Sequence, residues 1–209
     1  MITREVIGLS TIVAVCGVNF CTFVADQRKV RYTPDGIDIL SDKFKKIYRI
    51  NDHLIYGAAG VFNGDEHPQD VFTGCADINT LSVKMAKNMV VQYMRDNADK
   101  IGVRNCIVGG RVHGDKLELY EIHWDAKKRK PVVTQRAPNP PKQNFAVSVV
   151  LPPFVEARAT EIIGGVEAAV TGSRTVKELE TKLADIIDKM SKLDPSVGGE
   201  PQIITITGR

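Results

Sequence analysis

The chain has 209 residues, with 28 Lys and Arg against 25 Asp and Glu, for a formal net charge of +3. Hydrophobic residues make up 43% and charged residues 25%, which is ordinary globular composition and excludes a disordered, collagen-like or coiled-coil chain. A chain of this length suits one domain, residues 1–209, and needs no disulfide or metal to fold. The small charge excess also argues against a dedicated nucleic-acid-binding protein, and the basic run at 127–130 is interpreted as a solvated turn.

Cysteine and histidine positions give no sign of a metal or cofactor site. The four cysteines have no C-x-x-C spacing and the four histidines are scattered, so we expect buried free thiols and neither a metal nor a cofactor. Polar residues and Gly17 interrupt the apolar stretch that ends at Ala25, which favours a hairpin over a signal peptide or membrane helix. We therefore expect a cytoplasmic protein without a membrane partner.

The first half of the chain predicts two strand pairs and then a helix. β-branched, apolar runs indicate strands at 10–16 and 20–25 around a turn at 17–19. A polar loop follows, then a half-buried strand at 46–50 and a strand from 54 that ends at 57–60. Residues 62–74 look irregular. Asn79 or Thr80 is expected to cap the helix, whose apolar stripe is Leu81, Met85, Ala86, Met89, Val90 and Tyr93.

The second half predicts strands at 105–112, 116–124 and 145–150, and then two helices. The first helix begins near Pro153 and the second covers 176–190, while a Gly-rich turn at 194–201 precedes a last strand at 202–207. Strands, helix, strands, two helices and strand is an order typical of the α+β class. Two antiparallel sheets packed face to face, with helices outside both, would bury these apolar strands. We therefore expect a four-layer αββα sandwich.

The spacing of four residues in the first sixty is specific. Ser10 opens the first strand, Asp26 follows the second, Lys46 begins the third and Gly60 ends the fourth. Together with a turn that runs from Asp194 to two glycines, this spacing resembles proteasome β-subunits and HslV, members of the N-terminal nucleophile hydrolases. The resemblance covers nearly the whole chain. It implies the proteasome-like fold and a ring-type assembly with other copies or related subunits.

The resemblance also implies a role for each matching residue. A hydroxyl needs a base before it can attack, and in this family the base is the free α-amino group of the nucleophile residue itself. The chain would gain that group only if the Leu9–Ser10 bond were cleaved, which makes residues 1–9 an N-terminal extension or propeptide. The implied roles are nucleophile for Ser10, activating lysine for Lys46, lysine-orienting carboxylate for Asp26, oxyanion hole for Gly60, supporting carboxylate for Asp194, and supporting residues for Arg28, Ser148 and Ser196.

Departures from the family pattern leave two functions open. Leu9 stands where family precursors carry glycine, and the family's Ser-Gly-Gly segment falls at 148–150, where the serine is displaced by one and the glycines are absent. One hypothesis is a peptidase that hydrolyses amide bonds in unfolded polypeptide after cleavage. The other is a catalytically silent structural subunit of a cellular or viral assembly. An amidase for a small molecule has no support beyond the shared fold.

Each of these residues also has a purely structural interpretation. Ser10 could simply begin a strand, and Asp26 and Lys46 could form a buried structural pair. Gly60 could serve a close backbone approach, and Asp194 could cap a turn. The joint spacing of Ser10, Asp26, Lys46 and Gly60 is what favours the catalytic interpretation.

Overall fold

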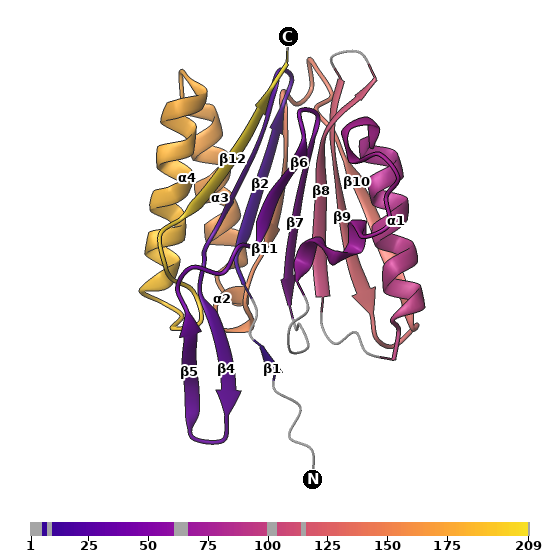
Figure 1. The fold of residues 1–209 in the computed structure, drawn as a ribbon. Coiled ribbons are helices and arrows are strands. Elements are labelled where there is room, and N and C mark those ends of the chain that lie inside the picture. Colours follow the sequence, from indigo (N-terminus) through magenta and orange to yellow (C-terminus); the bar gives the residue numbers. More distant parts are fainter. Residues whose placement is uncertain (1–5, 8–9, 61–66, 100–103, 114–115, 209) are drawn as a thin grey trace.

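Two antiparallel sheets face each other in the computed structural model, which describes residues 6–7, 10–60, 67–99, 104–113 and 116–208 (Figure 1). One sheet has the order β10-β9-β8-β7-β6 and the other β11-β2-β3-β12. Their strands are β2 (Ile12–Gly17), β3 (Phe20–Ala25), β6 (Ile47–Asn51), β7 (Leu54–Gly60), β8 (Arg104–His113), β9 (Lys116–Asp125), β10 (Lys130–Arg136), β11 (Phe145–Val150) and β12 (Gln202–Thr207).

Helices cover the outer face of each sheet, so the molecule has four layers (Figure 1). Helix α1 (Val83–Asp96) packs on the five-stranded sheet, while α3 (Ala159–Thr171) and α4 (Val176–Ser191) pack on the four-stranded sheet. Short helices stand at α2 (Pro153–Glu156), η1 (Pro68–Phe72) and η2 (Ile78–Thr80). The predicted α+β, αββα sandwich is therefore confirmed.

Strand β2 is buried on both faces, and the alternation of its side chains decides where Ser10 lies. Ile12, Ala14 and Cys16 pack between the two sheets, whereas Val13 and Val15 pack toward α3 and α4. Side chains alternate along a strand. Ser10 therefore continues the face between the sheets, and Thr11 continues the face toward the helices.

One side of the sandwich is held closed by side chains that cross from one sheet to the other. The Gln202 side-chain oxygen accepts hydrogen bonds from the backbone N–H groups of Lys46 and Ile47, each at 3.3 Å. The Gln202 amide nitrogen donates to the carbonyl of Ile47 at 2.6 Å. Farther along, Arg49 and Arg111 donate to backbone carbonyls of β12. The start of β6, and with it Lys46, is thereby fixed against the other sheet.

A small third sheet projects from the body where a polar loop was expected (Figure 1). It has the order β1-β4-β5, formed by β1 (Val6–Ile7), β4 (Lys29–Thr33) and β5 (Gly36–Ser41). The Pro-Asp-Gly segment at 34–36 is the turn of this hairpin, and Gly36 has a φ of 139°, a conformation that favours glycine. Strand β10 was also missed: it begins at Lys130, the last residue of the basic run that was interpreted as a turn.

The helix predictions need three corrections. Asn79 and Thr80 lie in η2, and the residue that caps α1 is Ser82, whose hydroxyl accepts a hydrogen bond from the Met85 N–H. Leu81 precedes α1 and is not part of the helix. Met85 is 56% exposed, since the buried face of α1 consists of Val83, Ala86, Val90 and Met94. The helix expected from Pro153 is divided into α2 and α3.

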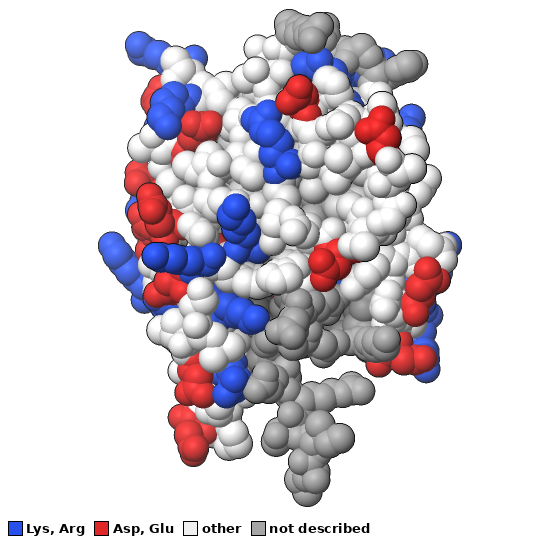
Figure 2. Space-filling view, in the orientation of Figure 1, with Lys and Arg blue, Asp and Glu red and all other residues white. Residues whose placement is uncertain are grey.

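The cysteines and the surface charges follow the composition of the chain. All four cysteines are free; Cys16, Cys21 and Cys106 are buried and Cys75 is half-buried. Within the described residues, no helix is long and apolar enough to span a membrane. Figure 2 shows positive and negative side chains interspersed on the face toward the viewer, most densely on the α4 side.

Candidate active site

A buried ion pair joins the two sheets at the end of the sandwich where β2 begins. Asp26 directly follows β3, and Lys46 directly precedes β6. The Lys46 Nζ atom lies 2.6 Å from Oδ2 of Asp26, and the two side chains are only 1% and 0% exposed. A lysine and an aspartate are almost never fully buried unless they are paired.

Backbone donors complete the surroundings of the Asp26 carboxylate. Oδ1 accepts the N–H of Thr11 at 2.8 Å, and Oδ2 accepts the N–H groups of Arg28 at 3.1 Å and Gly198 at 3.3 Å. Asp26 thus connects the first residues of β2, the turn before β12 and Lys46. Because Thr11 is the residue after Ser10, this network fixes the backbone beside the predicted nucleophile.

Burial changes the acidity of Lys46. Loss of hydration lowers the pKa of its ammonium group below the ordinary value, and the nearby charge of Arg28 lowers it further. The charge of Asp26 and the hydrogen bond to it oppose this shift without cancelling it. Lys46 therefore loses its proton more readily than a lysine on the surface.

Ser10 and Gly60 lie at this same end of the sandwich. Ser10 is 3% exposed and stands two residues before Ile12. Gly57 of β7 lies against Ile12 of β2, because a Cβ on Gly57 would lie 3.2 Å from Cδ1 of Ile12. Gly60 stands three residues beyond Gly57, at the end of β7. The N–H of Ala58 donates to the carbonyl of Lys46 at 2.9 Å, which places the end of β7 beside the ion pair.

The backbone of Gly60 has a φ of 128°, which L-residues with a side chain rarely adopt. The requirement for glycine at this position is therefore conformational. This backbone turns at the end of β7, where the resemblance expects an N–H that faces an oxyanion.

Arg28 holds the turn before β12 against the site. Its Nε and Nη2 atoms contact the two oxygens of Asp42 at 2.6 and 3.2 Å, and the hydrogen bond with Arg28 lowers the pKa of the Asp42 carboxyl group. Nη1 donates to the carbonyls of Pro195 and Val197. A Cβ on Gly198 would lie 2.4 Å from Cζ of Arg28, so a larger residue there would displace the guanidinium or the turn.

A second polar cluster lies in the same turn. Oδ1 of Asp194 accepts the backbone N–H of Ser196 at 2.8 Å and its hydroxyl at 2.6 Å. Both residues are 0% exposed. The Tyr32 hydroxyl of β4 is buried and has no hydrogen-bond partner among the described residues, and burial raises the pKa of this phenol. Asp194 and Ser196 therefore contact each other through two hydrogen bonds.

Ser148 does not lie with these residues. Its position in β11 is directly opposite Ala14 of β2, four residues from Ser10, which corresponds to roughly 13 Å along a strand. The Ser148 hydroxyl donates to Oε2 of Glu121 at 3.1 Å. The pairing register of β11 with β2 thus separates Ser148 from the predicted nucleophile, and the expectation that it supports Ser10 does not fit the structure.

Other contributors gave no signal along the sequence. Thr11 contributes a backbone N–H, and Asp42 and Gln202 contact residues far away in the chain. In the described part of the chain, no group of three His, Cys, Asp or Glu residues could hold a metal ion.

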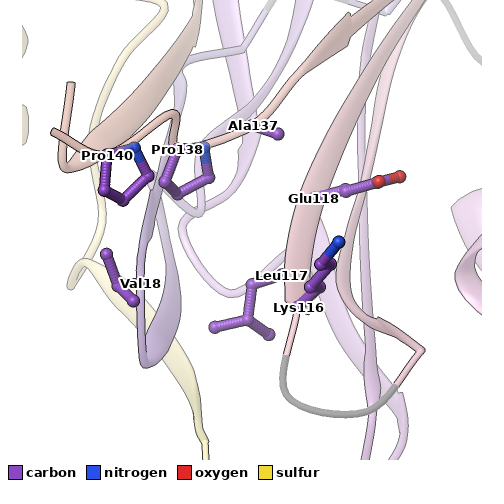
Figure 3. Close-up of a pocket in the computed structure, with 7 residues that line it drawn as sticks. All are labelled: Val18, Lys116, Leu117, Glu118, Ala137, Pro138 and Pro140. Carbon is purple, nitrogen blue, oxygen red and sulfur yellow. The ribbon is translucent and has the colours of Figure 1, made fainter. Parts of the chain in front are cut away.

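A cavity of about 490 Å³ lies at the opposite end of β2 and is distinct from this site. Val18, Leu117, Pro138 and Pro140 are among the residues around it (Figure 3). Val18 belongs to the turn between β2 and β3, and the length of β2 separates that turn from Ser10.

Comparison with known families places these residues in context. The model of the Proteasome family, described as proteasome subunit, matches residues 8–134. The chain belongs to the proteasome subunit family. Membership in this family implies assembly with other subunits. None of the curated proteins compared with this proteasome-family chain matches it.

The family match divides the candidate site into two parts. Ser10, Asp26, Lys46 and Gly60 all lie within the matched residues 8–134. Ser148, Asp194 and Ser196 lie beyond them. Ser148, the serine that is displaced from the family pattern, therefore occurs in the part of this proteasome-family chain that the family model does not cover.

Proposed function

We propose that this proteasome-family chain is a self-processing peptidase subunit in which Ser10 becomes the N-terminal nucleophile. The observation that supports this most is the buried Lys46–Asp26 pair, because Asp26 binds the backbone N–H of Thr11, the residue next to Ser10. A buried ion pair contributes little net stability, so stability alone is a weak reason for one at this position. The protein would form one domain, residues 1–209, with residues 1–9 as propeptide.

Processing would begin with attack of the Ser10 hydroxyl on the carbonyl carbon of Leu9. The peptide C–N bond breaks, an ester joins Leu9 to Ser10, and the proton from the hydroxyl passes to the nitrogen. Water then hydrolyses the ester, which restores the hydroxyl and releases residues 1–9 as a carboxylate. The product has a free α-amino group at Ser10, and this group is the base that the uncleaved chain lacks.

Peptide hydrolysis would use the same hydroxyl. The α-amino group accepts the Ser10 proton as the oxygen attacks a carbonyl of an unfolded polypeptide. Lys46 in its charged form favours the alkoxide and the neutral amine, and the Gly60 N–H donates to the developing oxyanion. The amino group returns the proton to the leaving amine, and water hydrolyses the acyl ester. As in β-subunits and HslV, the sites would face the chamber of a cytoplasmic ring.

Intact mass spectrometry of the assembled protein tests this proposal. Wild type is expected to lose residues 1–9, while Ser10→Ala keeps them. Ser148→Ala is the matched control: it removes a buried serine hydroxyl that contacts Glu121 instead, and it should process like wild type. Wild type that retains its full 23.0 kDa mass under assembly conditions would contradict the proposal, because the base would never form.

A structural subunit is the second candidate, and one observation favours it. Residues 6–7 of the extension pair with β4, with Val6 opposite Tyr32 and Ile7 opposite Arg31, so these two residues belong to a sheet. A silent subunit would assemble with residues 1–9 in place. A peptide electrophile that modifies N-terminal nucleophiles discriminates the two candidates, since only the peptidase would be labelled at Ser10.

A further inference from the structure

Gln202 is bound to the backbone on both sides of the buried ion pair. Its own backbone is paired with Ala25, the residue before Asp26. Its side chain reaches the other sheet, where the carboxamide oxygen accepts the N–H of Lys46 at 3.3 Å. One residue is therefore attached beside Asp26 by its main chain and to Lys46 by its side chain.

The Gln202 carboxamide acts toward β6 as a neighbouring strand would. Strand β6 is the edge of its sheet, so its outer side is not paired with another strand of the described chain. The carboxamide accepts the N–H of Ile47 at 3.3 Å and donates to the carbonyl of Ile47 at 2.6 Å. Paired residues in an antiparallel ladder exchange a donor and an acceptor in the same way. The start of β6 therefore has a definite position relative to β12.

The segment that leads into β12 is itself held beside Asp26. The N–H of Gly198 donates to Oδ2 of Asp26 at 3.3 Å. The N–H of Gln27 donates to the carbonyl of Gly198 at 2.8 Å, and the Gln27 side-chain nitrogen donates to the carbonyl of Glu200 at 2.6 Å. Gln202 thus extends from a segment whose position is set by Asp26 and its neighbour.

The Lys46 ammonium group is sensitive to the position of its backbone. Its Nζ atom lies 2.6 Å from Oδ2 of Asp26, and the Lys46 side chain is 1% exposed. Water cannot replace this contact at a fully buried position, and an unpaired buried ammonium is costly. A shift of the β6 backbone would therefore lengthen the ion pair and move the ammonium group relative to Ser10.

We propose that Gln202 is a positioning residue of the active site, which acts through the backbone of Lys46 to hold its ammonium group against Asp26 and in place for Ser10. The catalytic part of this inference rests on the proposed peptidase function, because only that function gives Lys46 a role toward Ser10. The inference goes beyond that function, since Gln202 lies outside residues 8–134, which match the family model.

Loss of the carboxamide should change two pKa values. A weaker contact with Asp26 lowers the pKa of Lys46 further, because the charge of Asp26 opposes the effect of burial. An ammonium group displaced from Ser10 favours the neutral α-amino group less, so the pKa of that amino group rises. Arg28 and Asp42 also act on Lys46, and a neutral substitution at Gln202 leaves their charges unchanged.

The experiment compares full-length Gln202→Met with wild type and with Arg49→Met, after each has assembled and processed. Methionine is similar in length to glutamine and uncharged, and it removes all three hydrogen bonds of the carboxamide. With an unstructured peptide, kcat should fall roughly ten- to a hundredfold, as for a misplaced catalytic group, while KM stays unchanged. The acidic limb of the kcat profile should move to higher pH.

Arg49→Met is the matched control for the link between the sheets. It removes a hydrogen bond between the same two strands, from Arg49 of β6 to the carbonyl of Thr205 on β12, away from the ion pair. This variant should keep the kcat and the pH profile of wild type. Equal changes in the two variants would overturn the inference, because any link between the sheets would then have the same effect.

A second measurement needs no peptidase activity. Urea denaturation at a series of alkaline pH values follows the titration of Lys46, with each protein compared with the same protein carrying Lys46→Met. The stability gained from loss of the Lys46 proton should begin at a lower pH in Gln202→Met than in the chain with Gln202. An unchanged onset would overturn the inference.

The two measurements separate failure of the inference from failure of the proposed function. Processed Gln202→Met with the kcat and pH profile of wild type would overturn the catalytic role of Gln202 while the peptidase function stands. Wild type that never loses residues 1–9 would overturn the peptidase function. In that case, or if Gln202→Met alone remains unprocessed, the onset of the Lys46 titration decides whether Gln202 positions Lys46.

Discussion

Lys46 and Asp26 come from different sheets, yet Nζ and Oδ2 lie 2.6 Å apart with both side chains almost completely buried. Lys46 stands at the edge of the five-stranded sheet and Asp26 at the end of β3 in the other. The pair therefore fixes the relation between the two sheets where β2 begins. Substitution of either residue tests how much the pair contributes to the stability of the fold.

Breaking this pair from the acidic side should destabilise the fold strongly. Asp26→Asn leaves the Lys46 ammonium buried without its counter-charge, which costs about 3–5 kcal/mol, whereas Asp26→Asn with Lys46→Met should recover part of that loss. Urea denaturation gives these values. The control is Glu161→Gln, which removes the exposed pair with Arg158 and should cost less than about 1 kcal/mol. Equal losses for the two single variants would contradict the burial argument.

The pH dependence of stability should carry the signature of Lys46. In the unfolded chain this lysine regains its ordinary pKa near 10.5, while burial lowers the pKa in the folded state. Between these two values the unfolded chain binds more protons, so the free energy of unfolding rises with pH. At pH values below the pKa of Lys46 in the folded state, the full cost of burying its ammonium group lowers the free energy of unfolding.

The measurement compares wild type with Lys46→Met by urea denaturation at a series of alkaline pH values. Wild type should gain stability relative to the variant as the pH rises toward 10.5, because the other titrating groups largely cancel in the difference. A difference that falls over this range would mean that the folded state favours the ammonium form, and the assigned direction would then be wrong.

Gly198→Ala should disturb the site through Arg28. The added Cβ would lie 2.4 Å from Cζ of Arg28, so the guanidinium or the turn must shift, and the hydrogen bond from the Gly198 N–H to Asp26 is lost or lengthened. Overpacking of this kind typically costs about 1–3 kcal/mol. Thermal unfolding measures the effect.

Gly164→Ala is the matched control for that substitution. Gly164 lies within α3, and a Cβ there meets nothing within 4 Å. Alanine in the interior of a helix is more favourable than glycine by roughly 1 kcal/mol, so this variant should be stabilised. If both glycine variants moved the melting temperature in the same direction, the steric explanation for Gly198 would fail.

Local patterns predicted the layers of the fold well. The β-branched runs at 10–16 and 20–25 form the buried strands β2 and β3, and the helix expected over 176–190 is α4. Strand β10 was missed because much of it is exposed, so its residues lack an apolar pattern. The buried face of α1 was assigned wrongly because two apolar residues do not belong to it. Leu81 is buried but precedes the helix, and Met85 is exposed.

The candidate site was predictable only where chain spacing carries the information. Asp26 and Lys46 lie together, as the family resemblance implied. Ser148 was misplaced because the register between β11 and β2 depends on contacts of the whole sheet. Gln202, more than 150 residues away from Lys46 in the chain, binds its backbone by a contact that no local pattern reveals.

The arginines that cross to β12 have a consequence for solubility. Strand β12 is an edge strand, and unpaired carbonyl groups on an edge can template the addition of a foreign strand. Arg49 and Arg111 donate to the carbonyls of Thr205 and Thr207, so two acceptors on that edge are occupied by bulky, charged groups. The last strand of the chain is thereby protected from edge-to-edge aggregation before any partner subunit arrives.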